Sequence, residues 1–238
     1  MIDGWNHIPY SELLSFIGID DYIHLWNANL DQPDSAIRSL GRLLSLEETK
    51  RAERFHFEKH RNRFIVCHGL LRVLLSQYTG IEPACLQILN GQKGKPALSK
   101  MHNDKDIRFN LSYSKNVSLI AITRAREIGV DIEYNSRSSD CEQIIGNFFS
   151  EKEKQFFYTQ TEKSKTDTFF KLWTKKEALV KALGVGLFIP LDSFDISLLD
   201  CEIVTLPSVE GFSENKSLWQ VNVLDSLAEF NASWAIEV

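Results

Sequence analysis

Residues 118–134 read SLIAITRAREIGVDIEY, and this stretch decides the fold class that the sequence predicts. Residues 118–123 and 128–134 are rich in apolar and β-branched side chains, which is typical of strands. Four charged or small residues, 124–127, separate the two runs and indicate a hairpin, although the Asn-Gly turn that would strengthen this signal is missing. Helical patterns lie on both sides of the hairpin, so the chain is expected to combine helices with sheet.

Further helices and strands are expected on both sides of this hairpin. Ser45 and Ser150 are good N-cap residues with acidic side chains in the turn that follows, and Gly80 and Gly184 each end a helical pattern. The expected helices are 45–55, 58–78, one that starts at Ser150, and 168–183; the expected strands are 22–30, 193–199, 219–224 and 234–238. The order of these elements predicts an α+β protein with two halves, residues 1–124 and 125–238.

Bulk properties limit the classes of partner. The chain has 238 residues and a formal net charge of −5, whereas proteins that coat nucleic acid are normally basic. Its start lacks a basic segment followed by an apolar stretch, no apolar run approaches the roughly 20 residues that span a bilayer, and none of its four cysteines forms a CxxC pair. A soluble cytoplasmic protein without nucleic-acid or membrane partners is therefore expected.

A pair of acidic residues is the first candidate for chemistry. Side chains two residues apart on a strand point to the same face, with Cα atoms roughly 6.5 Å apart. Asp131 and Glu133 would therefore lie side by side, while Val130 and Ile132 face the core. A divalent cation would relieve the repulsion between the two carboxylates, and oxygen ligands favour magnesium. Taken alone, such a pair is more often two solvated acids on an exposed strand face.

The second candidate is the helical segment 171–181, KLWTKKEALVK. Trp173, Glu177 and Lys181 are spaced four apart and therefore share one helix face. In isolation the last two are an ordinary Glu–Lys pair, worth a few tenths of a kcal/mol. The GxG at residues 184–186 follows a helix rather than a strand, which does not match a dinucleotide-binding motif.

The third candidate is segment 109–114, FNLSYS, which is expected to form a polar loop. Hydroxyl and backbone N–H groups in such a loop can bind phosphate oxygens. Lys95 and Pro96 lie upstream, at the end of the turn-rich segment 90–96, NGQKGKP. A serine-rich turn is equally well explained as a simple turn, so this feature is also weak alone.

The order and spacing of these features together resemble the signature of the Sfp-type phosphopantetheinyl transferases. The family pattern is a Ser-His-Ser loop, a G-[IV]-D-x-E strand, and a W-[ST]-x-K-E-x-x-x-K helix followed by G-x-G. The corresponding segments here are FNLSYS, GVDIEY and KLWTKKEALVKALGVGL. Residues 54–72 also resemble the helix of the family's first half, and residues 94–96 its GKP loop, so the resemblance covers about residues 45–194.

This resemblance implies a fold and a set of site residues. The fold is a pseudo-twofold pair of α+β halves, with coenzyme A bound and the active site formed in the cleft between them. The resemblance implies Mg²⁺, with Mn²⁺ as an alternative, held by Asp131, Glu133 and Glu177, and catalytic roles for Glu177 and Lys181. The implied contacts with coenzyme A are Arg51, Arg63, Lys95, Pro96, Ser112, Tyr113, Lys176 and Lys181; a one-residue shift would put Lys50 in the place of Arg51.

One position departs from the family pattern. The family usually has histidine where this chain has Tyr113. A tyrosine can donate one hydrogen bond but stays neutral at pH 7, whereas a protonated histidine adds positive charge. Weaker binding of coenzyme A is therefore expected, rather than loss of activity.

The implied reaction moves the 4′-phosphopantetheine arm of coenzyme A to a serine of an acyl or peptidyl carrier protein and releases 3′,5′-ADP. Glu177, or a water that it orients, is the expected general base, and the enzyme is expected to be a monomer. Two alternatives stay open: a protein that binds coenzyme A or a carrier protein without turnover, and a magnesium-dependent nuclease. The nuclease is disfavoured by the negative net charge and by Lys181, which lies on a predicted helix four residues after Glu177.

Overall fold

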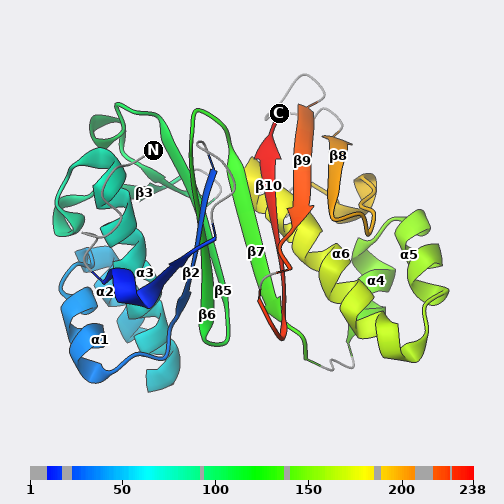
Figure 1. Ribbon diagram of the computed structural model, residues 1–238, viewed down its shortest axis with the longest axis horizontal. Helices are drawn as coiled ribbons and strands as arrows, with labels where there is room; N and C mark the ends of the chain where they lie inside the picture. The colour runs from blue at the N-terminus through cyan, green and yellow to red at the C-terminus, as the bar shows by residue number, and fades with distance from the viewer. Residues whose placement is uncertain are drawn as a thin grey trace. The chain divides into compact units, whose positions relative to one another are not determined.

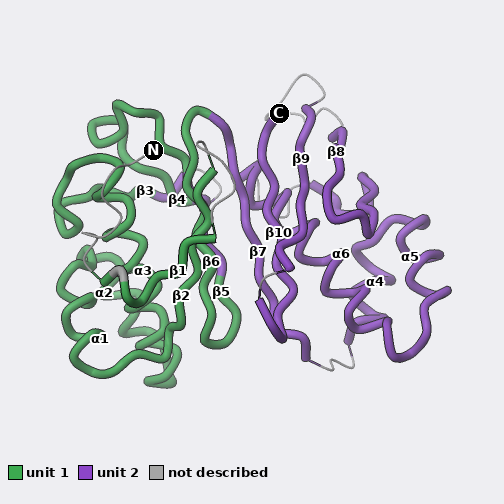
Figure 2. The backbone as a smooth tube through the Cα atoms, viewed as in Figure 1, with its two compact units in different colours: residues 1–89, 96–108, 113–125 green, residues 90–95, 109–112, 126–238 purple. Residues whose placement is uncertain are grey.

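The computed structural model describes residues 10–17, 23–91, 94–136, 140–184, 189–206, 217–225 and 227–238. Two compact units make up the chain, and Figure 2 shows them in separate colours. Unit 1 contains residues 1–89, 96–108 and 113–125, and unit 2 contains residues 90–95, 109–112 and 126–238. The expected division into residues 1–124 and 125–238 stays a prediction.

Unit 1 combines three helices with a mostly antiparallel sheet in its described part. Its helices are α1 (Asp34–Gly41), α2 (Leu46–Glu53) and α3 (Glu58–Thr79). The strands β1 (Leu14–Phe16), β2 (Ile23–Asn29), β6 (Val117–Arg124) and β5 (Ile107–Ser114) form one sheet in the order β1-β2-β6-β5, and β3 (Ile88–Asn90) pairs with β4 (Pro96–Leu98). Strand β5 contributes its residues 109–112 to unit 2.

Helix α3 forms the centre of unit 1, with α1 and α2 packed beside it (Figure 1). It ends where Gly80 takes a left-handed conformation (φ 75°), which glycine adopts without steric cost. The helix buries apolar side chains on several faces, including Phe64, Leu70 and Leu74. The Tyr78 hydroxyl also lies 2.5 Å from Nδ1 of His24 on β2, which joins the helix to the sheet.

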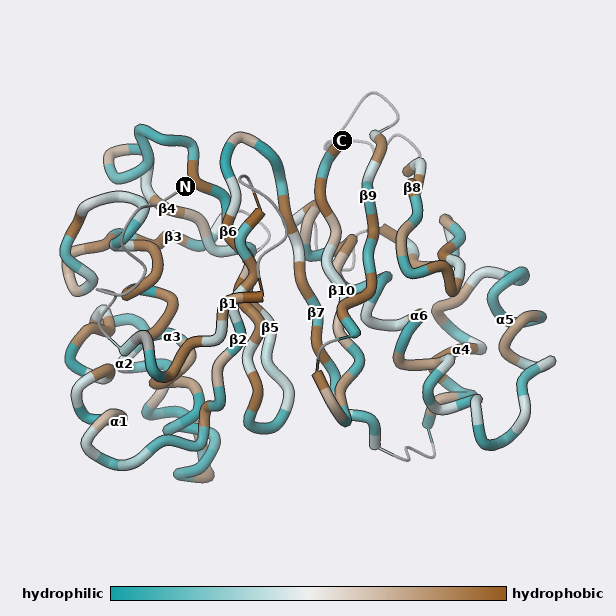
Figure 3. Tube along the Cα trace, viewed as in Figure 1, coloured by the Kyte–Doolittle hydropathy of each residue, from teal (hydrophilic) through white to brown (hydrophobic). Residues whose placement is uncertain are grey.

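Unit 2 combines helices α4 (Cys141–Phe148), α5 (Glu151–Tyr158) and α6 (Glu162–Leu183) with a second sheet. Strands β7 (Ile128–Tyr134), β10 (Phe230–Glu237), β9 (Ser217–Val223) and β8 (Cys201–Leu206) follow one another across this sheet, all antiparallel. Figure 3 shows hydrophobic stretches along β7 and β9. Helix α6 packs on β7, β10 and β9, and α4 and α5 pack on α6.

Gly129 allows α6 to approach β7 very closely. A Cβ atom at this position would lie 2.1 Å from the Ala178 carbonyl oxygen and 2.2 Å from the Ala182 backbone nitrogen. Both distances are too short for a non-bonded contact, so only glycine fits here. The backbone of the strand therefore rests directly on the backbone of the helix. This contact brings the acidic end of β7 to the same region as the Glu177 and Lys181 side chains of α6.

The local signals in the sequence are largely confirmed. Ser45 and Ser150 each cap a helix with a complete capping box, to Glu48 and Glu153 respectively. Gly184 ends α6 in a left-handed conformation (φ 67°), although α6 begins at residue 162, six residues before the predicted start. The strands expected at 22–30, 118–123 and 128–134 are present as β2, β6 and β7, while Tyr22 itself lies outside the described residues.

Three predictions about local structure are wrong. The hairpin expected across residues 118–134 does not form, because β6 lies between β2 and β5 in one sheet while β7 pairs with β10 in the other. Segment 109–114 is not a polar loop but most of strand β5, because its polar side chains Asn110 and Ser112 are buried and find partners there. Segment 193–199 is not a strand, and a short 3₁₀ turn, Leu191–Ser193, opens it. Its carbonyl oxygens face two buried lysines, Lys175 and Lys176, instead of a neighbouring strand.

In the parts of the chain that the structure describes, no helix is both long and apolar enough to cross a membrane.

Candidate active site

Asp131 lies at the centre of a hydrogen-bonded group in unit 2. It sits on β7 opposite Ser233 of β10, and its side chain is only 3% exposed. The Oδ1 atom accepts a hydrogen bond from the Ser112 hydroxyl at 2.9 Å and another from the Lys181 ammonium at 2.5 Å. The ammonium also donates to the Ser112 hydroxyl at 3.0 Å. Three residues that the sequence singled out separately, from a predicted loop, strand and helix, therefore meet at one carboxylate.

Glu177 lies within electrostatic reach of the same group. Burial raises the pKa of its carboxyl, the charge of Asp131 raises it further, Lys181 lowers it, and Glu133 adds a smaller upward effect. The charges of these side chains therefore act on one another. The role of Asp131, Glu133 and Glu177 as metal ligands stays a prediction.

Two observations fit this carboxylate group to a hard divalent cation. Asp131 Oδ2 is buried and has no hydrogen-bond partner among the residues that the structure describes, although buried carboxylate oxygens are costly to leave unsatisfied. Burial raises the pKa of Glu177, and the nearby charge of Asp131 raises it further, so a cation here would relieve unfavourable charge. Oxygen ligands of this kind suit Mg²⁺. Among the described residues, however, no three His, Cys, Asp or Glu side chains already stand close enough to form a ready-made metal site.

Lys176 is buried beside Glu177 on α6, and its ammonium is engaged within unit 2. It donates to the carbonyl oxygens of Leu191 at 2.6 Å and Phe194 at 2.9 Å, and it forms an ion pair with Glu153 at 2.9 Å. Burial lowers its pKa, while Glu153 opposes this effect. The ammonium therefore ties α6 to the cap of α5 and to the chain after α6, which supports a positioning role.

Lys95 is engaged in a similar way near the other end of β7. Its ammonium donates to Glu127 Oε2 at 2.6 Å and to the carbonyl oxygens of Ile128 at 3.0 Å and Ala182 at 2.7 Å. Its side chain also packs against Gly184, since a Cβ there would lie 2.9 Å from Lys95 Cδ. Pro96, the next residue, opens strand β4, a position where its missing N–H costs little.

Arg51 and Tyr113, two predicted contacts of coenzyme A in unit 1, interact with each other. Burial raises the pKa of the Tyr113 phenol, Cys67 adds to this, and the Arg51 guanidinium lowers it. The Arg51 guanidinium also stacks over the Phe64 ring, 5.4 Å from its centre. Tyr113 remains 37% exposed, so a ligand can reach both side chains.

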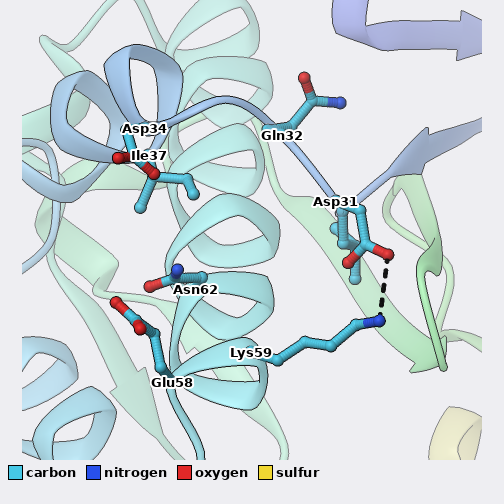
Figure 4. A pocket seen from close by; sticks show the side chains of 8 residues that line it. Asp31, Gln32, Asp34, Ile37, Glu58, Lys59 and Asn62 are labelled. Atoms are coloured by element: carbon cyan, nitrogen blue, oxygen red, sulfur yellow. Dashed lines mark ion pairs between the residues drawn. The ribbon is translucent and has the colours of Figure 1, made fainter.

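Arg63 forms a bidentate ion pair with Asp31, with hydrogen bonds of 2.6 and 2.7 Å. Figure 4 shows Asp31 beside an open pocket of about 550 Å³ in unit 1, where Lys59 also pairs with it. None of the predicted site residues lines this pocket; the lining residues are Leu30, Asp31, Gln32, Asp34, Ile37, Glu58, Lys59 and Asn62. Its carboxylates are largely paired, and the acidic group around Asp131 is therefore the better candidate for chemistry.

Three supporting residues were not found from the sequence. The Asn110 side chain accepts a hydrogen bond from the Val130 backbone N–H at 2.9 Å, directly beside Asp131. The buried hydroxyls of Thr174 and Ser233 lie 3.0 Å apart and join α6 to β10. Ser233 could have been noticed in the sequence as a small polar residue within an apolar run. The partners of all three residues, in contrast, are set by the tertiary structure. Val185 and Gly186 of the predicted GxG lie outside the described residues.

Comparisons with known proteins identify the family of this chain. Residues 127–236 match the sequence model of the 4′-phosphopantetheinyl transferase superfamily, and residues 26–125 match that of the 4′-phosphopantetheinyl transferase N-terminal region. The 4′-phosphopantetheinyl transferase HetI of Nostoc sp. is 35% identical over 216 residues, which are 91% of each chain. The 4′-phosphopantetheinyl transferase Sfp of Bacillus subtilis is 29% identical over 65% of this chain and 66% of its own.

The solved structure of the holo-[acyl-carrier-protein] synthase of Thermotoga maritima aligns with 47% of this chain and 62% of its own. The TM-score is 0.29 and the sequence identity 23%, so this structural similarity is too low to support an argument. The sequence matches carry the assignment. The chain belongs to the 4′-phosphopantetheinyl transferase superfamily, a family of transferases that use coenzyme A as substrate. This membership places the chain among transferases rather than among nucleases.

Proposed function

We propose that this protein transfers the 4′-phosphopantetheine group of coenzyme A to a serine of an acyl or peptidyl carrier protein and releases 3′,5′-ADP. The observation that carries the proposal is the group formed by Asp131, Glu177, Lys181 and Ser112 within a chain that matches this family along its length. The carrier hydroxyl attacks the phosphorus next to pantetheine, so negative charge develops on the departing 3′,5′-ADP.

Asp131, Glu133 and Glu177 are the proposed ligands of a Mg²⁺ ion, with Mn²⁺ as an alternative. When bound, such an ion supplies positive charge for the pyrophosphate oxygens and the leaving group. The buried Oδ2 of Asp131 has no hydrogen-bond partner among the described residues, and this supports the assignment, because a cation would supply the missing partner.

Lys181 and Ser112 are the proposed donors to the substrate phosphates. The Lys181 side chain is 31% exposed and already touches the Ser112 hydroxyl, so both groups can present donors to one anion. Glu177, or a water that it orients, is the proposed general base for the carrier serine, because its carboxylate belongs to the charged group around Asp131 and Lys181.

Arg51 and Tyr113 are the proposed contacts with coenzyme A in unit 1. Arg63, Lys95, Pro96 and Lys176 are proposed to shape the binding region rather than to bind by their charge, because the three cationic groups already bind acceptors within the protein. We also propose that the enzyme is a cytoplasmic monomer.

The direct test is mass spectrometry of an apo carrier protein incubated with the enzyme, coenzyme A and Mg²⁺. We expect the carrier to gain the mass of one phosphopantetheine, and we expect EDTA to abolish the gain. Glu177→Gln should reduce the rate by at least about 100-fold, the usual scale for a lost general base, without changing the circular dichroism spectrum.

Glu162→Gln is the matched control, because it makes the same change at an 87% exposed position on the same helix. Its rate should equal that of the wild type. Full activity of Glu177→Gln would refute the role of Glu177. No modification of several unrelated carriers would refute transfer and support a binding protein without turnover.

A further inference from the structure

Lys181 and Asp131 form an ion pair in which one partner is buried and the other is partly exposed. Asp131 sits on β7, a strand paired along its length with β10 and covered by α6. The Lys181 ammonium reaches it from the last turn of α6 at the end of a flexible four-carbon stem. The exposed fraction is 3% for the Asp131 side chain and 31% for that of Lys181. The ammonium can therefore leave the carboxylate, whereas the carboxylate cannot follow it.

Glu177 lies one helical turn before Lys181 on α6, and its charge interacts with those of Asp131 and Lys181. Asp131 Oδ1 accepts from the Lys181 ammonium and the Ser112 hydroxyl, while its buried Oδ2 has no hydrogen-bond partner among the described residues. A second cation is attracted to this group by the carboxylates, but it is repelled by the ammonium at the same carboxylate.

We propose that Lys181 is a built-in counter-ion of Asp131 and that its ammonium competes with the divalent cation for this carboxylate. The proposal rests on the metal ligands assigned under the proposed function. Once Asp131 is neutralised by the cation, the Lys181 ammonium is released and can donate to a phosphate oxygen of coenzyme A. The cation and the phosphate then favour each other's binding, since each takes one partner of the ion pair.

This proposal and a purely structural role of Lys181 predict opposite changes in the affinity for the divalent cation, because loss of a structural residue would weaken cation binding. Removal of the Lys181 charge should tighten binding of the divalent cation, although it should impair turnover. The probe is Mn²⁺ alone, measured with the full-length chain in the absence of coenzyme A, by the electron paramagnetic resonance signal of the free ion. Lys181→Met should bind Mn²⁺ about tenfold more tightly than the wild type, which corresponds to about 1.4 kcal/mol.

Two variants serve as controls. Lys181→Arg keeps the charge and should bind Mn²⁺ like the wild type. Lys163→Met removes one charge from an exposed position near the other end of α6 and should also match the wild type. In saturating coenzyme A, the affinity for Mn²⁺ should rise more in the wild type than in Lys181→Met. Only the wild type has an ammonium that can leave Asp131 and donate a hydrogen bond to the phosphate instead.

The outcomes separate this proposal from the proposed function. If the wild type binds Mn²⁺ and Lys181→Met binds it equally or more weakly, the competition is refuted and the metal site stands. If Lys163→Met tightens Mn²⁺ binding as much as Lys181→Met, the tighter binding is explained by the change in net charge, and the proposed competition at Asp131 is refuted. If neither the wild type nor Lys181→Met binds Mn²⁺, the metal site itself is refuted, and the competition with it.

Discussion

At the scale of single residues, the structure gives several side chains tasks that their types alone do not reveal. Asn110 and Ser112 look like loop residues in the sequence, yet both are buried on β5 with partners on β7. Lysines 175 and 176 look like solvated residues of a helix, yet both are fully buried and hold carbonyl oxygens and a glutamate. A buried polar group of this kind is stable only because specific partners surround it.

Tyr113 leads to a prediction about recognition of coenzyme A. Its phenol stays neutral at pH 7, and burial raises its pKa further. We expect Tyr113→His to lower the KM for coenzyme A by roughly threefold to tenfold, with the larger effect below about pH 6.5, where histidine is protonated. Steady-state kinetics between pH 5.5 and 8 measure this. Tyr113→Phe, which only removes the hydroxyl, should raise the KM modestly at every pH; an unchanged KM in both variants would mean that residue 113 does not contact the substrate.

At the scale of elements, the contact between α6 and β7 sets the geometry of the site. The α6 side chains Glu177 and Lys181 reach Asp131 only because Gly129 lets the two backbones touch. Buried bonds elsewhere along α6 support the same placement, from Thr174 to Ser233 and from Lys176 to Glu153. These contacts explain why an ordinary Glu–Lys spacing on a helix becomes a site.

Gly129→Ala should separate these two elements. Its Cβ would meet backbone atoms, which cannot rotate away, so we expect a loss of stability of about 3 kcal/mol, at the upper end for overpacking, together with loss of transfer activity. Urea unfolding and the carrier assay measure the two effects. Gly146→Ala is the matched control, because a Cβ there, on α4, meets nothing within 4 Å, and it should be neutral or slightly stabilising. Wild-type stability of Gly129→Ala would contradict the close approach.

A second prediction at this scale concerns the junction of α2 and α3. Burial raises the pKa of Glu48, but hydrogen bonds from His68, the Ser45 N–H and Arg72 outweigh it and lower the pKa to about 2. Because the folded pKa lies below the unfolded value of about 4.5, this group stabilises the protein above pH 4.5 and loses its contribution as the pH falls toward 2.

We therefore expect unfolding in urea to become easier between pH 5 and pH 2, by roughly 2 kcal/mol after allowance for screening at this half-buried position. Glu48→Gln should remove that part of the pH dependence and be less stable at pH 7, since the buried Arg72 guanidinium loses its ion pair. Glu47→Gln, at an exposed neighbouring position, should keep the wild-type profile. An unaltered profile in Glu48→Gln would show that Glu48 does not control acid stability.

At the scale of the whole molecule, each unit builds its own core from a 22-residue helix and a sheet. The site residues proposed for the metal, the phosphates and coenzyme A all belong to one chain. We therefore expect a monomer with a mass near 27.3 kDa by light scattering, and a specific activity that does not change with enzyme concentration. A dimer whose activity falls on dilution would contradict this and would indicate a site shared between copies.

The amino-acid sequence by itself determined the features that depend on neighbours three or four residues apart. The serine caps and the glycine ends of α3 and α6 belong to this group, because a capping hydrogen bond needs only local chain geometry. The order and spacing of the motifs along the sequence also predicted the class of the protein. Only the tertiary structure decided that residues 109–114 form a strand, that residues 193–199 do not, and that Lys181 pairs with Asp131. These outcomes depend on partners 18 to 50 positions away in the chain, and such partners become neighbours only when the helix packs on its sheet.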